Sequence, residues 1–203
     1  MSDFTDRIKN GEAGPHWQAF TALIEDPAPN ATIQMQADTP GHDLVREYVD
    51  HAHAVHSALK ENWGITVDPK AGSSPKPVGE GAPRWYGVGQ APDYSKPGHP
   101  ATPPQEPVPT DQYTPYHTLK HVLRTDSNRN LSRQFKGVPK PYVGGWRTTE
   151  FQGREGEDLV VEDQSTVHRS KDIAMDEAKK RNEQAVFESD TFGEIKNPHY
   201  QPS

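Results

Sequence analysis

Proline is concentrated in one stretch of this chain, and that stretch limits the folds that the chain can adopt. Of the 20 prolines among 203 residues, 12 lie between residues 67 and 115. Proline lacks an amide hydrogen and has a fixed φ, so a segment this rich in proline excludes an uninterrupted helix or a central strand. The segment favours an extended polyproline II conformation instead. We therefore predict an extended tether over residues 67–115.

The composition offers little material for a large core. Hydrophobic residues make up 31% of the chain, against about 45–50% in typical globular proteins, a count that also includes glycine. Ordering each residue costs on the order of 1–2 kcal/mol of backbone entropy, and apolar burial is the main contribution that offsets it. The expected fold class is mainly irregular and extended, with several short helices and little β-structure. Such a chain is non-globular, and a partner stabilises it.

A helical docking region is predicted over residues 1–66. Its longest helix runs from Pro40 to Trp63, because apolar residues recur there every three or four positions and form one stripe. A shorter helix is predicted from Pro15 to Asp26, between a glycine and two prolines. The alternation of apolar and polar residues over 33–37 favours a short strand between the two helices.

The region from residue 116 to residue 203 is predicted to hold short, separate elements. Two helices are expected at 116–124 and 127–136, the second ended by Gly137. Gly144 and Gly145 interrupt the apolar run that follows. A strand is expected at 158–161, and a mostly charged final helix at 170–189, where Glu177 and Arg181 have the spacing of a helical ion pair.

Several large aromatic residues lie where no core is expected, so we interpret them as anchors for another chain. Arg84, Trp85 and Tyr86 stand among glycines and prolines that offer no local core, and aromatic and arginine side chains often carry binding energy at interfaces. The full set of predicted partner-binding residues is Trp17, Tyr48, Trp63, Arg84, Trp85, Tyr86, Arg129, Arg133, Phe135, Tyr142 and Trp146.

The segment 116–147 is locally basic although the chain carries a formal net charge of -7. Seven lysines and arginines face one acid, Asp126, and aromatic residues are interleaved with them. This mixture is typical of proteins that bind single-stranded nucleic acid, and it also suits an acidic protein surface. Because six acids follow between Glu150 and Asp163, pairing within the chain is a third interpretation.

The best metal-ligand candidates are His117 and His121, which lie one helical turn apart. A zinc hydrolase with an HExxH motif needs a glutamate where Thr118 stands, so this activity is excluded. Two partly exposed histidines on a basic helix are the simpler interpretation.

Motifs for catalysis are missing from the sequence. There is no Gly-x-Ser-x-Gly elbow, and the glycines at 79, 81, 87 and 89 match neither a phosphate-binding loop nor a dinucleotide fingerprint. The adjacent acids Glu162 and Asp163 are interpreted as solvated loop charges. We therefore expect no enzymatic activity and no cofactor, with a metal-dependent enzyme that uses the two histidines as an alternative.

The predicted function is structural. The chain has no cysteine, no apolar signal-peptide core and no run long enough to cross a membrane, so we expect synthesis in the cytoplasm and a final place in a virion. The expected partners are other protein subunits of a large assembly, or further copies of this chain. Our specific hypothesis is a minor capsid, cement or head–tail joining protein of a tailed phage. The alternatives are a nucleic-acid-associated protein and an accessory subunit of a cellular complex.

Overall fold

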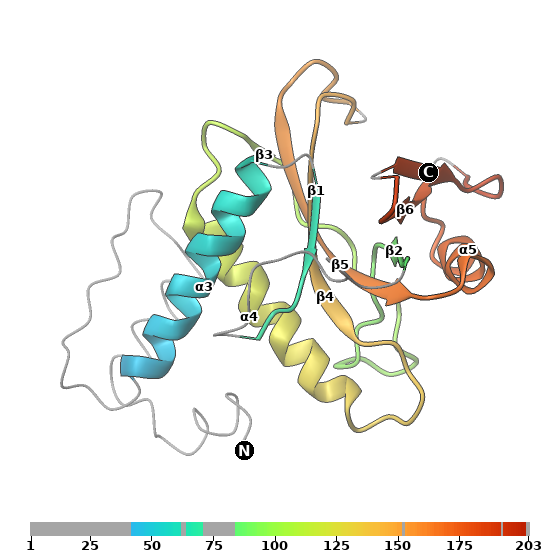
Figure 1. Ribbon diagram of the computed structural model, residues 1–203, viewed down its shortest axis with the longest axis horizontal. Coiled ribbons are helices and arrows are strands. Elements are labelled where there is room, and N and C mark those ends of the chain that lie inside the picture. The colour runs from blue at the N-terminus through green and yellow to red at the C-terminus, as the bar shows by residue number, and fades with distance from the viewer. Residues whose placement is uncertain (1–41, 62–63, 71–83, 152, 192, 202–203) are drawn as a thin grey trace.

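The computed structural model describes residues 42–61, 64–70, 84–151, 153–191 and 193–201, which form a seven-stranded antiparallel sheet with three helices (Figure 1). The expectation of a mainly irregular, non-globular chain with little β-structure is therefore wrong. The composition misled because many of the buried positions hold hydrogen-bonded polar side chains, such as Thr118, Asn128 and Gln164, rather than apolar ones.

Strands from distant parts of the sequence lie side by side in the sheet. The order is β1 (Gly64–Val67), β4 (Pro141–Thr148), β5 (Leu159–His168), β2 (Tyr86–Val88), β6 (Ala185–Glu188) and β7 (Gly193–Lys196). The short β3 (Val108–Pro109) pairs with the beginning of β5. All of these pairs are antiparallel.

Two helices cover one face of β1, β4 and β5. The first, α3 (His42–Glu61), lies within the predicted range 40–63 and buries Tyr48, Ala52, Val55 and Leu59 of the predicted stripe. The second, α4 (Pro115–Ser132), packs beside α3 and contributes Leu119 and Val122 to the same core. This layer holds the larger of the two apolar clusters.

The helix α4 is continuous where the sequence predicted two helices. Thr125 and Asp126, at the predicted break, are both buried on its inner side, and Thr125 Oγ1 donates a hydrogen bond to the carbonyl of His121 (2.8 Å). The helix ends at Ser132, and Gly137, with a φ of 77°, lies in the turn that follows.

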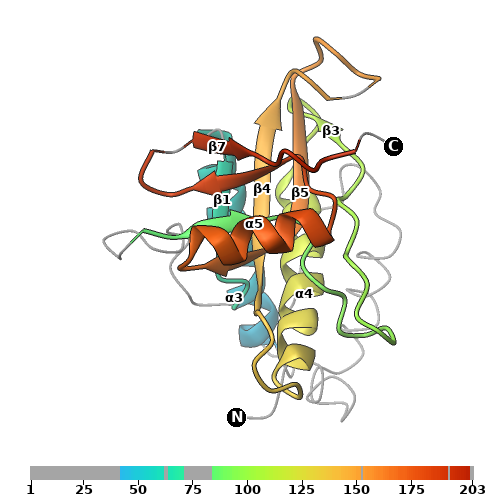
Figure 2. The ribbon, with the colours of Figure 1, turned by 90° about the vertical axis from the view of Figure 1, so that its right-hand side faces the viewer.

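The third helix, α5 (Lys171–Lys180), covers the other part of the sheet. Ala174 and Ala178 pack on Tyr86, Val88 and Val186. The predicted helix 170–189 is too long, because residues 185–188 form β6, which pairs with both β2 and β7. Figure 2 shows α5, β6 and β7 running across the long β4–β5 pair.

The proline-rich segment, described over residues 67–70 and 84–115, belongs to the folded domain. Its backbone follows the edge of β5, since the amides of Ala91 and Gln105 donate hydrogen bonds to the carbonyls of Gln164 and Glu162. The expectation that this segment holds no central strand is wrong, because β2 lies between β5 and β6 in the sheet. Turns over residues 93–99 also interrupt the predicted extended conformation. Residues 71–83, the predicted helix 15–26 and the predicted strand 33–37 lie outside the described residues.

Candidate functional site

A cleft of about 230 Å³ lies where β1, β4 and β5 meet β2, β6 and β7. Side chains alternate between the two faces of a strand. Val67 and Val143 face the helices, so Thr66, Trp146 and Asp163 face the cleft from the opposite side of the sheet. The cleft therefore lies on the face that α3 and α4 leave uncovered.

Two carboxylic acids meet at the base of this cleft. Asp163, on β5, is only 4% exposed, and Glu183 lies in the turn between α5 and β6. A methyl group at Gly89 would overlap Asp163 Oδ2 and would lie 2.9 Å from Glu183 Oε1. Both oxygens therefore approach one point beside the backbone of Gly89, close enough for the charge of Asp163 to raise the pKa of Glu183,.

Gly144 is a second glycine that leaves space for the carboxyl group of Asp163. A side chain at Gly144, which is paired with Asp163 in the β4–β5 ladder, would overlap Asp163 Oδ1 and Ser165 Oγ. Ser165 Oγ instead donates a hydrogen bond to Asp163 Oδ1 (2.9 Å). The two acids thus occupy space that side chains at Gly89 and Gly144 would need.

Burial makes ionisation of both acids costly. Burial raises the pKa of Asp163, although hydrogen bonds from Ser165 and the Gln90 amide oppose the shift. Burial, together with the charge of Asp163, raises the pKa of Glu183 to about 7. Glu183 Oε1 is buried and accepts no hydrogen bond from any described residue. Near neutral pH the pair is therefore suited to holding one proton, or a cation in its place.

The walls of the cleft combine acids with aromatic rings. Among the described residues that line it, Asp163, Glu183 and Glu194 are acidic and none is a lysine, arginine or histidine. Trp146 and Phe187 supply apolar wall. An acidic cleft with aromatic walls is complementary to a positively charged group.

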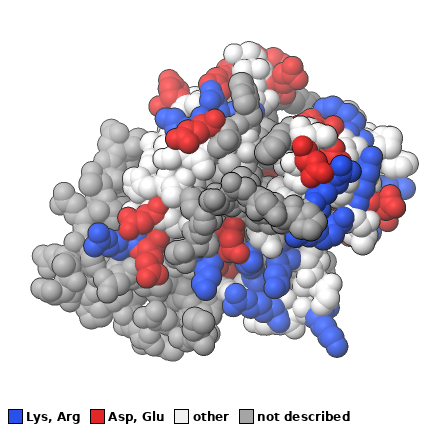
Figure 3. All heavy atoms as spheres, viewed as in Figure 1, with Lys and Arg blue, Asp and Glu red and all other residues white. Residues whose placement is uncertain are grey.

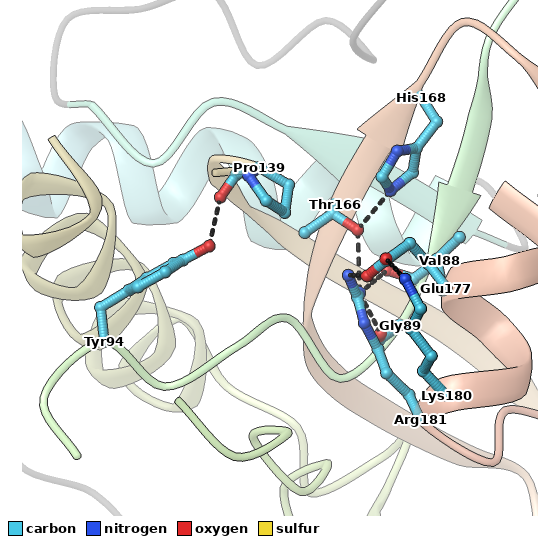
Figure 4. A network of polar contacts seen from close by, with 9 residues as sticks. All are labelled: Val88, Gly89, Tyr94, Pro139, Thr166, His168, Glu177, Lys180 and Arg181. Atoms are coloured by element: carbon cyan, nitrogen blue, oxygen red, sulfur yellow. Dashed lines mark hydrogen bonds and ion pairs between the residues drawn. The ribbon is translucent and has the colours of Figure 1, made fainter. Parts of the chain in front are cut away.

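Arg181 lies behind the cleft and holds its backbone in place (Figure 4). Its guanidinium donates to the carbonyl of Gly89 (2.9 Å), to Thr166 Oγ1 (2.8 Å) and to Glu177 Oε2 (2.7 Å). The pair with Glu177 confirms the spacing noted in the sequence. The bond to the carbonyl of Gly89 holds the backbone of this turn in place. Arg181 is not among the residues that line the cleft.

The two predicted metal-ligand candidates have other contacts. The imidazole of His121 is buried, its Nε2 donates to the carbonyl of Asp163 (2.5 Å), and burial lowers its pKa to about 4. Nδ1 of His117 accepts from the amide of Thr114 (3.2 Å) at the start of α4. No group of three or more potential metal ligands occurs in the described parts of the chain.

The interpretation of Glu162 and Asp163 as solvated loop charges is wrong, because both are buried in β5. Glu162 faces the helix layer, where the hydroxyl of Tyr113 donates to it (2.5 Å). Burial raises the pKa of Glu162 to about 7. β-Branched residues on both sides of these acids, Val160 and Val161 before them and Thr166 and Val167 after them, are the sequence signal that one strand continues through them,.

The predicted anchors have varied environments. Trp85 and Tyr86 are 3% and 5% exposed, so the chain supplies the core that the sequence did not show. Tyr48 is buried, and its hydroxyl donates to Asp126 (2.7 Å).

The remaining predicted partner-binding residues divide into four groups. Arg84 and Arg129 form ion pairs with Asp190 and Asp68, and Arg129 lies over the ring of Tyr142. Trp146 lines the cleft, whereas Arg133 and Phe135 are exposed. Trp17 and Trp63 lie outside the described residues.

The described residues thus form a mixed α/β domain with an acidic, aromatic-walled cleft. No family model matches the chain, and neither the curated proteins nor the solved structures include a significant match. Within the described residues, no helix has the length and apolar character needed to span a membrane.

Proposed function

We propose that this protein binds a ligand with a positively charged nitrogen, an amine or a guanidinium, in the cleft between β5 and β6. The observation that carries the proposal is the pair of the buried Asp163 and the half-buried Glu183, whose oxygens converge beside Gly89. Two carboxylates this close repel each other when both are ionised, and the charge of Arg181 offsets this only in part, since the pKa of each remains raised,. A ligand N–H group would stabilise both by charge-assisted hydrogen bonds.

The size and the walls of the cleft restrict the ligand further. A volume of about 230 Å³ is below the ~300–1,000 Å³ typical of sites for drug-sized ligands. The cleft therefore suits a small amine or a single side chain better than a large cofactor. Trp146 and Phe187 offer ring surface to the cation or to the carbon atoms next to it,.

Calorimetry on the full chain tests the proposal, with agmatine and cadaverine as probes and butanol as an uncharged control. We expect Asp163→Asn and Glu183→Gln each to weaken binding about tenfold to a hundredfold, because each removes a charged acceptor. Asp190→Asn, which removes an acid outside the cleft, is the matched control. Butanol binding as well as the amines, or no amine binding at millimolar concentration, would contradict the proposal.

The affinity should also depend on pH. Protons compete with a cation for the pair, so binding should strengthen as the pH rises through about 7, the pKa of Glu183,. In Glu183→Gln this dependence should be much smaller. A flat profile in the unsubstituted protein would show that the ligand does not contact Glu183.

The assembly function predicted from the sequence remains a prediction. Part of its basis, a chain unable to fold without a partner, is contradicted by the fold. The virion location, the protein partners and the lack of enzymatic activity are likewise predictions. Affinity capture from the native source followed by mass spectrometry tests them together, since a capsid partner would identify the assembly directly.

A further inference from the structure

A second surface lies at the end of α4, away from the cleft. The turn of residues 133–140 joins α4 to β4, and the loop of residues 93–100 packs against it. The hydroxyl of Tyr94 donates to the carbonyl of Pro139 (2.7 Å; Figure 4), and the amide of Tyr94 donates to Asn128 Oδ1 (2.8 Å). These bonds hold the loop and the turn together as one surface.

The surface presents an aromatic ring that two other rings support. Phe135 is 37% exposed, one of the two exposed large hydrophobic residues in the described chain. Its ring stacks on Tyr94 at 5.7 Å and meets His99 edge-on at 4.4 Å. The position of the ring is therefore fixed, and part of its surface remains open to a ligand.

Positive charge surrounds this ring. Arg133, Lys136 and Lys140 are exposed, and none of them forms an ion pair with a described residue. The sequence holds no acid between Asp126 and Glu150. Figure 3 shows lysine and arginine atoms gathered at the lower end of the molecule, where Figure 1 places the end of α4. We call Arg133, Phe135, Lys136, Lys140 and His99 the basic tip.

Pairing within the chain accounts for only part of the basic segment. Arg147 pairs with Asp158 (2.7 Å), as the third sequence interpretation expected. Arg129 is occupied by Asp68. The charges of the basic tip remain, on a protein whose net charge is -7.

We propose that the basic tip binds single-stranded nucleic acid. Phosphates would contact Arg133, Lys136 and Lys140, and an unpaired base would stack on Phe135. Base stacking on an aromatic ring beside cationic side chains is the recognition mode of non-specific single-strand binders. A double helix keeps its bases stacked internally, so it could use the charges but not the ring.

Fluorescence anisotropy of the full chain at low ionic strength tests this proposal, with labelled single-stranded oligothymidine as the probe. Changing Arg133, Lys136 and Lys140 together to glutamine should weaken binding at least tenfold. Three lost phosphate contacts should also reduce the slope of log K against log salt by about 2. Changing Lys171, Lys179 and Lys180 of α5 to glutamine removes equal charge elsewhere and should have little effect.

The contribution of the ring is tested separately. Phe135→Leu keeps an apolar side chain but removes the stacking surface, and it should weaken binding roughly fivefold to tenfold. Melting temperatures should show that the variants remain folded. Equal binding of the triple variant, or duplex binding as tight as single-strand binding, would overturn the proposal. Binding of polyglutamate as tight as that of the oligonucleotide would also overturn it, in favour of an acidic protein partner.

Discussion

Glu162 and Asp163 are neighbours on β5, and their different surroundings distinguish the two faces of the sheet. Glu162 points toward α3 and α4, where the hydroxyl of Tyr113, a member of the apolar cluster, donates to it. Asp163 points into the cleft, where it meets a second acid and glycines. Burial raises the pKa of both carboxyls. Two carboxyls of similar burial therefore have different surroundings: Glu162 is bonded within the core, whereas Asp163 faces Glu183, whose Oε1 has no hydrogen-bond partner among the described residues.

The largest expected effect tests whether the helix-covered face supplies most of the stability. Leu59→Ala, at a position that is 1% exposed, should lower the free energy of unfolding by about 2–5 kcal/mol, because it leaves a cavity between α3 and the sheet. Ile173→Ala on α5, which is 55% exposed, should change it by less than about 0.5 kcal/mol. Urea unfolding measures both. Similar losses in the two variants would contradict the assignment of the core.

The next effect concerns the acid on the helix-covered face. The pKa of Glu162 in the folded chain, about 7, lies above its ordinary value of 4.5. Folding therefore favours the protonated form, and this contribution to stability is lost as the pH rises from about 4.5 through about 7. Relative to the unsubstituted protein, Glu162→Gln should gain on the order of 2–3 kcal/mol over this range. A difference in unfolding free energy that does not change with pH would contradict the prediction, and the exposed Glu150→Gln is the control.

A smaller effect on stability is expected at Gly144, where the carboxyl of Asp163 approaches the backbone of β4 on the cleft face. Gly144→Ala places a methyl group where Asp163 Oδ1 and Ser165 Oγ lie, so it should lower the unfolding free energy by about 1–3 kcal/mol and weaken binding of agmatine. Gly64→Ala meets only ordinary contacts, the nearest at 3.6 Å, and should lower the unfolding free energy much less. Because Gly64 lines the cleft, this variant is a control for stability and not for binding. If Gly144→Ala is as stable as the unsubstituted protein and binds agmatine equally well, Asp163 does not occupy this space.

The sequence predicted the helix-covered face better than the cleft face. The helix α3 could be predicted because its apolar residues recur every three or four positions. Gly144 and Gly145 suggested an interrupted run. In the structure, a side chain at Gly144 would overlap Asp163 on the cleft face, whereas one at Gly145 would meet Leu59 on the helix-covered face. The strand β4 was missed for this reason.

The sequence contains a signal for the end of α5 that the prediction did not use. Asn182 has a left-handed backbone with a φ of 54°, and asparagine is a known terminating residue just beyond a helix. The continuing charged pattern hid this signal. The acid pair was not predictable, because Asp163 and Glu183 are 20 residues apart in the sequence and meet only through the pairing of β5, β2 and β6.

The most direct test of the cleft is a carbon-13 NMR titration of the Glu183 carboxyl, with and without agmatine. We predict a pKa of about 7 for the free protein and a clear decrease when agmatine binds, because the cation stabilises the ionised carboxylate. A Glu183 carboxyl that titrates near the ordinary value of 4.5, and does not respond to agmatine, would contradict the account.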